Sequence, residues 1–151
     1  MPLEIGDKAP EFETTTDSGE PVSSELLKGK KFVLYFYPRD NTPGCTKEAC
    51  SIRDNYQTFL DQNILIYGAS GGNAKSHQKF INKYNLPFPL LMDENLELAK
   101  KFEAYRRGKR VARTTYLIDE DGTIEGIFGA EGHEKVKTSQ HAEQIIQFWK
   151  L

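Results

Sequence analysis

Hydrophobic runs alternate along this chain with stretches in which apolar side chains recur every three or four positions. Residues Lys31–Tyr37 are apolar on both alternating faces, which is typical of a central strand covered on both sides. Pro38 follows and cannot continue a strand ladder. Residues Ile64–Ala69 predict a second buried strand. Residues Thr114–Asp119 and Thr123–Phe128 predict a hairpin around an Asp-Gly turn.

Helical periodicity of the apolar residues predicts four helices. They are expected from Pro43 to about Gln62, around His77–Tyr84, from about Glu94 to Tyr105, and at the C-terminus over Ala142–Trp149. The N-terminal segment Ile5–Leu27 carries turn residues and is interpreted as an irregular hairpin. Alternation of strands and helices predicts an α/β fold with a mixed central sheet, helices on both faces and an N-terminal β-hairpin extension.

Composition narrows the function classes. The 151 residues predict one domain, residues 1–151. With 20 basic and 22 acidic side chains, the net charge is −2, which gives no reason to expect a nucleic-acid or membrane partner. No apolar run approaches the roughly 20 residues that span a bilayer, and Met1–Glu4 lacks a basic targeting segment. We therefore expect a cytoplasmic protein.

Cysteine and histidine are too sparse for a disulfide scaffold or a zinc site. The chain has two cysteines, Cys45 and Cys50, and three histidines that are scattered along it. This spacing does not match zinc-ligand motifs, so no metal or cofactor is expected. The two cysteines must therefore serve thiol chemistry or packing.

Cys45 lies where a predicted helix begins. Thr42 is a plausible N-cap and Pro43 occupies the first helical position, which places Cys45 in the first turn. Unpaired backbone N–H groups and the positive end of the helix dipole there favour a thiolate. An ordinary thiol, with a pKa of about 8.5, is only a few per cent ionised at neutral pH. Cys45 is therefore a candidate nucleophile, although a buried packing cysteine would show the same local pattern.

Cys50 is expected to lie off the apolar face. At about 100° per residue, Cys45 falls near the centre of that face and Cys50 about 130° from it. In an intact helix two residues five apart have Cα atoms about 8.7 Å apart, beyond the approximately 7 Å reach of a disulfide. A disulfide between the two cysteines would therefore require local unwinding.

Several segments resemble the peroxiredoxins, specifically the bacterioferritin-comigratory or Q-type subgroup. Tyr35–Cys50 is similar to the active-site motif of that subgroup, and Gly6–Phe12 to its N-terminal motif. Ser76–Leu91 resembles the middle of the family sequence, and Arg113–Asp119 the strand that carries its active-site arginine. The resemblance spans nearly the whole chain and implies a thioredoxin-like fold.

The resemblance also implies roles for five residues. Cys45 would be the peroxidatic cysteine, with Cys50 as the resolving cysteine. Pro38 would shield the pocket, Thr42 would hydrogen-bond to the sulfur and the peroxide, and Arg113 would stabilise the thiolate. Negative charge on the departing oxygen is what a guanidinium, a hydroxyl and helix-start N–H groups can stabilise.

The implied activity is reduction of hydrogen peroxide and organic hydroperoxides. The first product would be a sulfenic acid, which the second thiol converts to a disulfide before further oxidation. Thioredoxin or a similar dithiol would then reduce that disulfide. The resemblance favours a monomer, with a weak dimer as the alternative, and the C-terminal Trp149–Leu151 carries no further cysteine for an intersubunit disulfide.

The chain departs from the subgroup at some positions, and two other function classes fit the same cysteines. Ala69–Asn73 replaces a Val-Ser-x-Asp-like run, and Ile52 stands where an aromatic residue is frequent.

A thiol–disulfide oxidoreductase shares the expected fold but uses a C-x2-C spacing. A non-catalytic redox sensor could use the same disulfide to alter partner binding. Turnover with a reductant distinguishes these alternatives.

Other polar residues have ordinary structural interpretations. His77 is interpreted as a packing or capping histidine, and Arg39 and Asp40 as polar residues at a strand end. The basic residues between Arg106 and Arg110 are interpreted as a solvated turn, with anion steering as the alternative.

Overall fold

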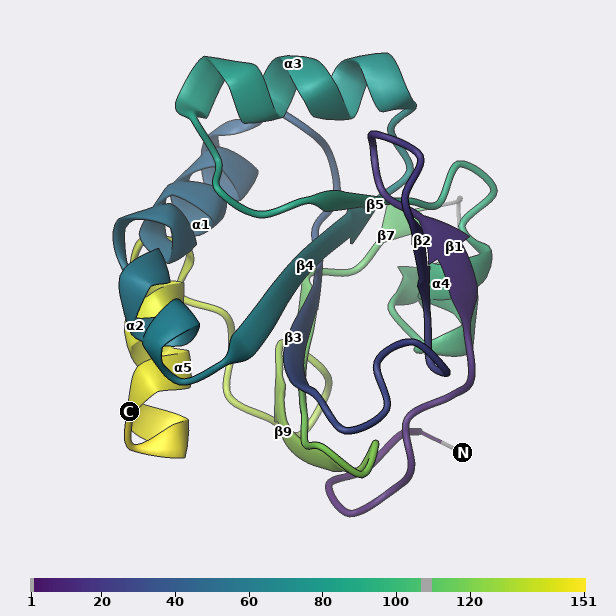
Figure 1. Ribbon diagram of the computed structural model, residues 1–151, viewed down its shortest axis with the longest axis vertical. Coiled ribbons are helices and arrows are strands. Elements are labelled where there is room, and N and C mark those ends of the chain that lie inside the picture. Colours follow the sequence, from purple (N-terminus) through teal and green to yellow (C-terminus); the bar gives the residue numbers. More distant parts are fainter. Residues whose placement is uncertain (1, 107–109) are drawn as a thin grey trace.

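The computed structural model describes residues 2–106 and 110–151, and its centre is a mixed five-stranded sheet (Figure 1). The strand order is β5-β4-β3-β8-β9, in which β3 pairs parallel with β4 and antiparallel with β8. In chain order the elements are β1 Glu13–Thr15, β2 Pro21–Ser23, β3 Lys31–Phe36, α1 Pro43–Asp54, α2 Tyr56–Asp61, β4 Ile64–Ser70, α3 Ala74–Tyr84, β5 Leu90–Met92, α4 Glu97–Lys101, β6 Tyr105–Arg106, β7 Arg110–Val111, β8 Thr114–Ile118, β9 Ile124–Phe128, a short 3-10 turn Thr138–Gln140, and α5 His141–Trp149. The predicted α/β class with a central Lys31–Tyr37 strand is confirmed.

Helices cover both faces of the sheet, as the sequence predicts. Alternate side chains of β3 enter two separate hydrophobic clusters, one with Val33 and Tyr35 and the other with Phe32 and Leu34. The first cluster packs against α1, α2, α3 and α5, and the second against α4 and the β1–β2 hairpin. Figure 1 shows this division, with α1, α2 and α5 on one side of the sheet and α4 with the hairpin on the other.

The prediction of one continuous helix from Pro43 to about Gln62 is wrong. The segment forms two helices, α1 and α2, separated at Asn55, whose backbone (φ −114°, ψ 13°) leaves the helical region. The Asn55 side chain donates to the Ser51 carbonyl at 2.9 Å, and such local bonds compete with the helical ladder. Beyond this break Phe59 is buried, whereas Leu60 is 47% exposed.

The predicted helix from Glu94 to Tyr105 is too long. The Asp93 carboxylate accepts hydrogen bonds from the backbone N–H groups of Leu98 and Ala99, so α4 begins only at Glu97. Tyr105 instead belongs to a small β6–β7 hairpin that the periodicity did not predict, and the short strand β5 was also missed. Within the basic segment, Arg106 and Arg110 lie in this hairpin, while Arg107 and Lys109 fall outside the described residues.

The strand register brings two distant segments together at one end of the sheet. Phe36, the last residue of β3, pairs with Thr114, the first residue of β8. The loop from Pro38 to α1 therefore starts beside Arg113, the residue that precedes β8. This pairing places Cys45 and Arg113 in the same neighbourhood.

Candidate active site

Cys45 occupies the position that the sequence predicts. It lies in the first turn of α1, with Pro43 at the first helical position and Thr42 as an extended N-cap residue. Its side chain is buried, and both cysteines are free thiols. Backbone N–H groups of this first turn have no helical acceptor and favour negative charge on the sulfur.

Arg113 connects Cys45 to a second side chain. Its Nη2 donates to Cys45 Sγ at 3.4 Å, and its Nη1 donates to Glu48 Oε1 at 2.7 Å. Burial lowers the pKa of Arg113, but the negative charges of Glu48 and Cys45 outweigh burial and raise it above its ordinary value. The guanidinium therefore stays cationic next to the sulfur.

Glu48 is a site residue that the sequence reasoning missed. It is fully buried and lies one turn after Cys45 on the same side of α1. Burial raises the pKa of Glu48 to about 7, although Arg113 acts in the opposite direction. The spacing of three residues from Cys45 was the signal available in the sequence, but a glutamate in a helix is usually solvent-exposed.

Thr42 lies at the predicted position but makes a different hydrogen bond. Its hydroxyl donates to the Arg39 carbonyl oxygen at 3.0 Å and does not cap the helix. The hydrogen bonds described for Thr42 in this structure include none to Cys45, so the implied contact with the sulfur would need a rotation of the hydroxyl. The Thr42 carbonyl accepts the backbone N–H of Thr46 at 2.8 Å and so starts the helical ladder.

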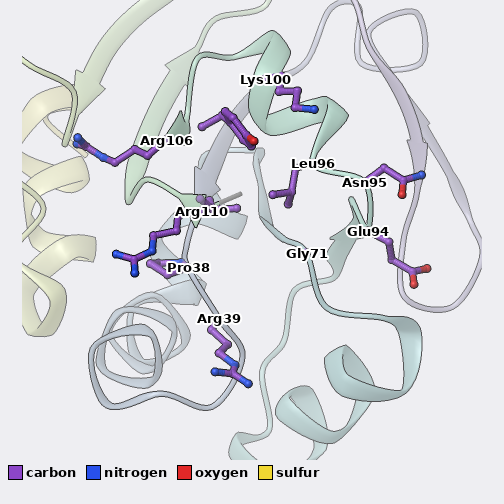
Figure 2. Close-up of a pocket in the computed structure, with 11 residues that line it drawn as sticks. Pro38, Arg39, Gly71, Glu94, Asn95, Leu96, Lys100, Arg106 and Arg110 are labelled. Atoms are coloured by element: carbon purple, nitrogen blue, oxygen red, sulfur yellow. The ribbon is translucent and has the colours of Figure 1, made fainter. Parts of the chain in front are cut away.

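Pro38 is exposed at the end of β3 and lines a cavity of about 880 Å³. Figure 2 shows Pro38 beside Arg110, with Leu96 on the opposite side of the space between them. Of the five predicted site residues, Pro38 is the one found among the described residues that line this cavity. Pro38, which lies between β3 and α1, therefore connects the segment that leads to Cys45 with the wall of this cavity.

Cys50 is half-buried in the same unbroken helix as Cys45. Because α1 runs continuously from Pro43 to Asp54, the two cysteines are held at helical spacing. The Cα separation of about 8.7 Å expected for that spacing is too long for a disulfide. Oxidation to a disulfide must therefore rearrange α1.

Asp40 is a second residue that the sequence reasoning underestimated. Its carboxylate is nearly buried and accepts hydrogen bonds from Tyr37 Oη at 2.6 Å and Ser76 Oγ at 2.6 Å, and His77 Nδ1 lies 2.7 Å away. Burial raises the pKa of Asp40, but these hydrogen bonds outweigh burial and lower it below its ordinary value. Asp40 thus ties the loop before Cys45 to helix α3.

His77 completes this connection between the loop and the sheet. Its Nε2 lies 3.0 Å from the Leu91 carbonyl oxygen, so both ring nitrogens face acceptors. His77 is fully buried, as the packing interpretation predicts, and it also fixes the position of Asp40.

Gly72 provides the space for this network. A Cβ added at Gly72 would lie 2.6 Å from Asp40 Oδ2 and 3.2 Å from the His77 ring. The glycine pair at positions 71 and 72, where the sequence departs from the resembled subgroup, thus includes one residue whose missing side chain is needed by the loop.

Neither a metal site nor a membrane helix is found in the described part of the chain. Among residues 2–106 and 110–151, no group of three or more His, Cys, Asp or Glu side chains could hold a metal ion. None of the helices within these residues is long and apolar enough to cross a membrane.

Comparison with known proteins adds independent information on this site. The sequence profile of the AhpC/TSA family matches residues 5–127. The chain is 40% identical to peroxiredoxin Bcp of Bacillus subtilis over 99% of its length and 97% of that protein. It is also 40% identical to the chloroplastic peroxiredoxin Q of Sedum lineare, over 94% of its length and 75% of that protein.

A solved structure agrees with these sequence matches. The crystal structure of peroxidoxin BcpB from Mycobacterium tuberculosis superposes with a TM-score of 0.86 and 31% identity. The superposition covers 98% of this chain and 97% of that one.

Proposed function

The chain belongs to the AhpC/TSA family of peroxiredoxins, in the Bcp or peroxiredoxin Q subgroup, and on that premise we propose that Cys45 is its peroxidatic cysteine and Cys50 its resolving cysteine. The fold is thioredoxin-like, and the protein is a thiol peroxidase. The observation that carries the residue assignment is the 3.4 Å contact between Arg113 Nη2 and Cys45 Sγ at the start of α1.

In the first step the Cys45 thiolate attacks one oxygen of the hydroperoxide. An S–O bond forms, the O–O bond breaks, and the other oxygen leaves with the electron pair and takes up a proton to become water or an alcohol. Arg113 and the N–H groups of the first helical turn stabilise the charge that moves from sulfur to oxygen. Thr42, after its hydroxyl leaves the Arg39 carbonyl, adds a further donor or acceptor.

In the second step the Cys50 thiol attacks the Cys45 sulfenic acid. A disulfide forms and the sulfenic oxygen leaves as water, which protects Cys45 from irreversible oxidation. Since helical spacing separates the two cysteines, the turns of α1 between them must unwind first. The half-exposed Cys50 is the sulfur that a protein reductant can approach.

Membership of this family implies a peroxide substrate and a thioredoxin-type reductant. We assign both hydrogen peroxide and organic hydroperoxides as substrates, and thioredoxin itself as the physiological dithiol. Residues 1–151 are proposed to act as one domain, as a monomer and in the cytoplasm. The electrons come from thiols, so the proposed cycle needs no cofactor.

The proposal is tested by peroxide-dependent NADPH consumption in the presence of thioredoxin and its reductase. Wild type is expected to turn over repeatedly, Cys45→Ser to show no turnover, and Cys50→Ser to consume a single equivalent of peroxide. Undiminished turnover by Cys45→Ser would contradict the assignment. Disulfide formation without turnover in wild type would instead favour a redox sensor or a different reductant.

A further inference from the structure

A buried pair of titratable side chains lies next to Arg113. Glu48 Oε2 has no hydrogen-bond partner, and it lies 3.7 Å from Nε2 of His141, the first residue of α5. Both side chains are completely shielded from solvent. An unpartnered carboxylate oxygen in such a place is costly unless it carries a proton or faces a donor.

The hydrogen bonds of Gln144 determine which nitrogen of His141 carries the proton. Gln144 Nε2 donates to the Lys135 carbonyl at 2.9 Å and to Glu134 Oε2 at 2.7 Å. Gln144 Oε1 accepts the backbone N–H of Lys137 at 3.0 Å, which fixes the orientation of the amide. The same Oε1 lies 2.8 Å from His141 Nδ1, so Nδ1 must be the N–H donor.

The other nitrogen of His141 then presents a lone pair. Nε2 accepts a hydrogen bond from the Thr115 hydroxyl at 2.8 Å. Burial lowers the pKa of His141 to about 4, so the ring is neutral. The 3.7 Å contact with Glu48 is therefore not an ion pair, and an ionised Glu48 would face a lone pair.

The charges around Glu48 do not balance when the Cys45 thiol and the Glu48 carboxyl are both ionised. Its neighbours are Arg113 before β8, His141 on α5 and Tyr35 on β3. Cys45 on α1 shares Arg113 with it, and Thr115 on β8 is bonded to His141. Burial raises the pKa of Tyr35 well above its ordinary value, so it is a neutral phenol. Among these groups Arg113 supplies the single positive charge, and a Cys45 thiolate and a Glu48 carboxylate would compete for it.

We propose that Glu48, packed against the neutral ring of His141, carries a proton while Cys45 is a thiolate and gives it up when the sulfur loses its charge. The inference rests on the proposed peroxidase cycle. Thiolate, hydroperoxide and protonated Glu48 become sulfenic acid, alcohol and ionised Glu48: the leaving oxygen gains one proton and the carboxyl loses one, so the overall charge of the site does not change. Reduction of the disulfide returns Cys45 to a thiol, whose proton Glu48 takes up as the thiolate forms.

This arrangement predicts a descending limb in the pH dependence of peroxide reduction. While Glu48 is protonated and neutral, the positive charge of Arg113 acts on the sulfur and the departing oxygen. Once Glu48 ionises, near its raised pKa of about 7, the carboxylate draws the guanidinium away from the reaction. Glu48 acts through Arg113 and is thus a positioning residue.

The first test compares single-turnover rate constants for hydrogen peroxide across pH. Wild type is expected to lose rate several-fold between about pH 6 and about pH 8.5, and Glu48→Gln to lack this decrease, because the amide cannot ionise. Glu143→Gln removes an exposed glutamate of α5 and should keep the wild-type profile. A descending limb that persists in Glu48→Gln would overturn the inference.

The second test observes the proton directly in the wild-type protein. Infrared difference spectra between reduced and peroxide-treated protein should show a protonated carboxyl band that disappears on oxidation and is missing from Glu48→Gln. Nitrogen-15 spectra of reduced protein should show His141 neutral with its proton on Nδ1. A reduced protein with no protonated carboxyl band at about pH 6 would contradict the inference, whereas absence of peroxide consumption at every pH would refute the peroxidase proposal itself.

Discussion

Arg113 Nη2 donates to Cys45 Sγ across 3.4 Å, although 68 positions separate the two residues in the chain. The contact exists because β8 pairs with β3 and delivers Arg113 to the end of the sheet where α1 begins. A sulfur held between a guanidinium and a helix start is an anion site. The chemistry proposed for this chain depends on that arrangement.

Replacing Arg113 should slow the attack on peroxide. Arg113→Gln removes the charge that faces both Cys45 and Glu48, and we expect a loss of about 10²-fold in the second-order rate constant, as for other transition-state donors. Arg113→Lys should recover only part of the rate, because one ammonium cannot reproduce the two-pronged contact. Arg39→Gln, which alters an exposed arginine, serves as the control.

These rates are obtained by competition for hydrogen peroxide with a second thiol peroxidase of known rate. Equal losses in Arg113→Gln and Arg39→Gln would indicate that general charge, and not the contact with the sulfur, sets the rate.

Gly72→Ala should disturb the loop before Cys45 more than Gly71→Ala does. The added methyl group at Gly72 meets Asp40 Oδ2 at 2.6 Å and the His77 ring at 3.2 Å, both held by hydrogen bonds. The methyl group at Gly71 meets the end of the Leu96 side chain at 3.0 Å, which can move. We expect Gly72→Ala to lower the free energy of unfolding by about 1–3 kcal/mol.

Urea denaturation of both variants measures this difference, and the peroxidase rate shows whether the Cys45 loop has shifted. Equal stability of the two variants would mean that the hydrogen bonds of Asp40 do not hold the loop rigidly.

The stability of Glu48→Gln relative to wild type should increase with pH. Folding raises the pKa of Glu48 from 4.5 to about 7, so the folded state binds more protons than the unfolded state between these values. Wild type therefore loses stability as pH rises through this window, by on the order of 3 kcal/mol. The glutamine variant does not ionise and should avoid that loss.

The pKa of His141 is shifted in the opposite direction to that of Glu48, so its contribution to the pH dependence of stability must be separated from that of Glu48. Its folded pKa of about 4 lies below the ordinary 6.5, so its contribution to stability grows as pH rises between these values. Because both proteins retain His141, the difference between their unfolding free energies at about pH 5 and about pH 8 isolates Glu48. A difference that does not change with pH would show that Glu48 keeps an ordinary pKa.

Oxidation should unwind α1 and leave α2 intact. The interruption of the helix at Asn55 separates α1 from α2, and the buried side chain of Phe59 packs α2 into the core. Amide resonances of residues 42–54 are expected to shift when the disulfide forms. Those of α3, residues Ala74–Tyr84, provide the internal reference and should stay in place. Identical spectra of the two states over residues 42–54 would rule out the unwinding step.

The sequence was sufficient for the central strand and for the position of Cys45 because both depend on local patterns. Two-sided hydrophobicity over Lys31–Tyr37 indicates a buried strand, and Thr42 with Pro43 indicates a helix start. The break at Asn55 was not predicted, because the apolar spacing continues through it. At this break the Asn55 side chain donates to the Ser51 carbonyl, and apolar periodicity contains no information on such a bond.

Partners far away in the chain explain why Glu48 and Asp40 were overlooked. Glu48 can be buried because Arg113, 65 residues later, pairs with it. Asp40 is held by Ser76 and His77 on α3, 36 and 37 residues later. A charged residue without a visible partner is ordinarily assigned to the surface. Such roles emerge only once the sheet order brings the partners together.

The most direct test of the central claim is mass spectrometry of reduced protein after one equivalent of hydrogen peroxide. Wild type should yield an intramolecular Cys45–Cys50 disulfide, and Cys50→Ser should yield a sulfenic acid that a dimedone probe labels at Cys45. Cys45→Ser should remain unmodified. Labelling at Cys50 in Cys45→Ser, at a rate equal to that of Cys45 in Cys50→Ser, would contradict the assignment of Cys45 as the residue that attacks peroxide.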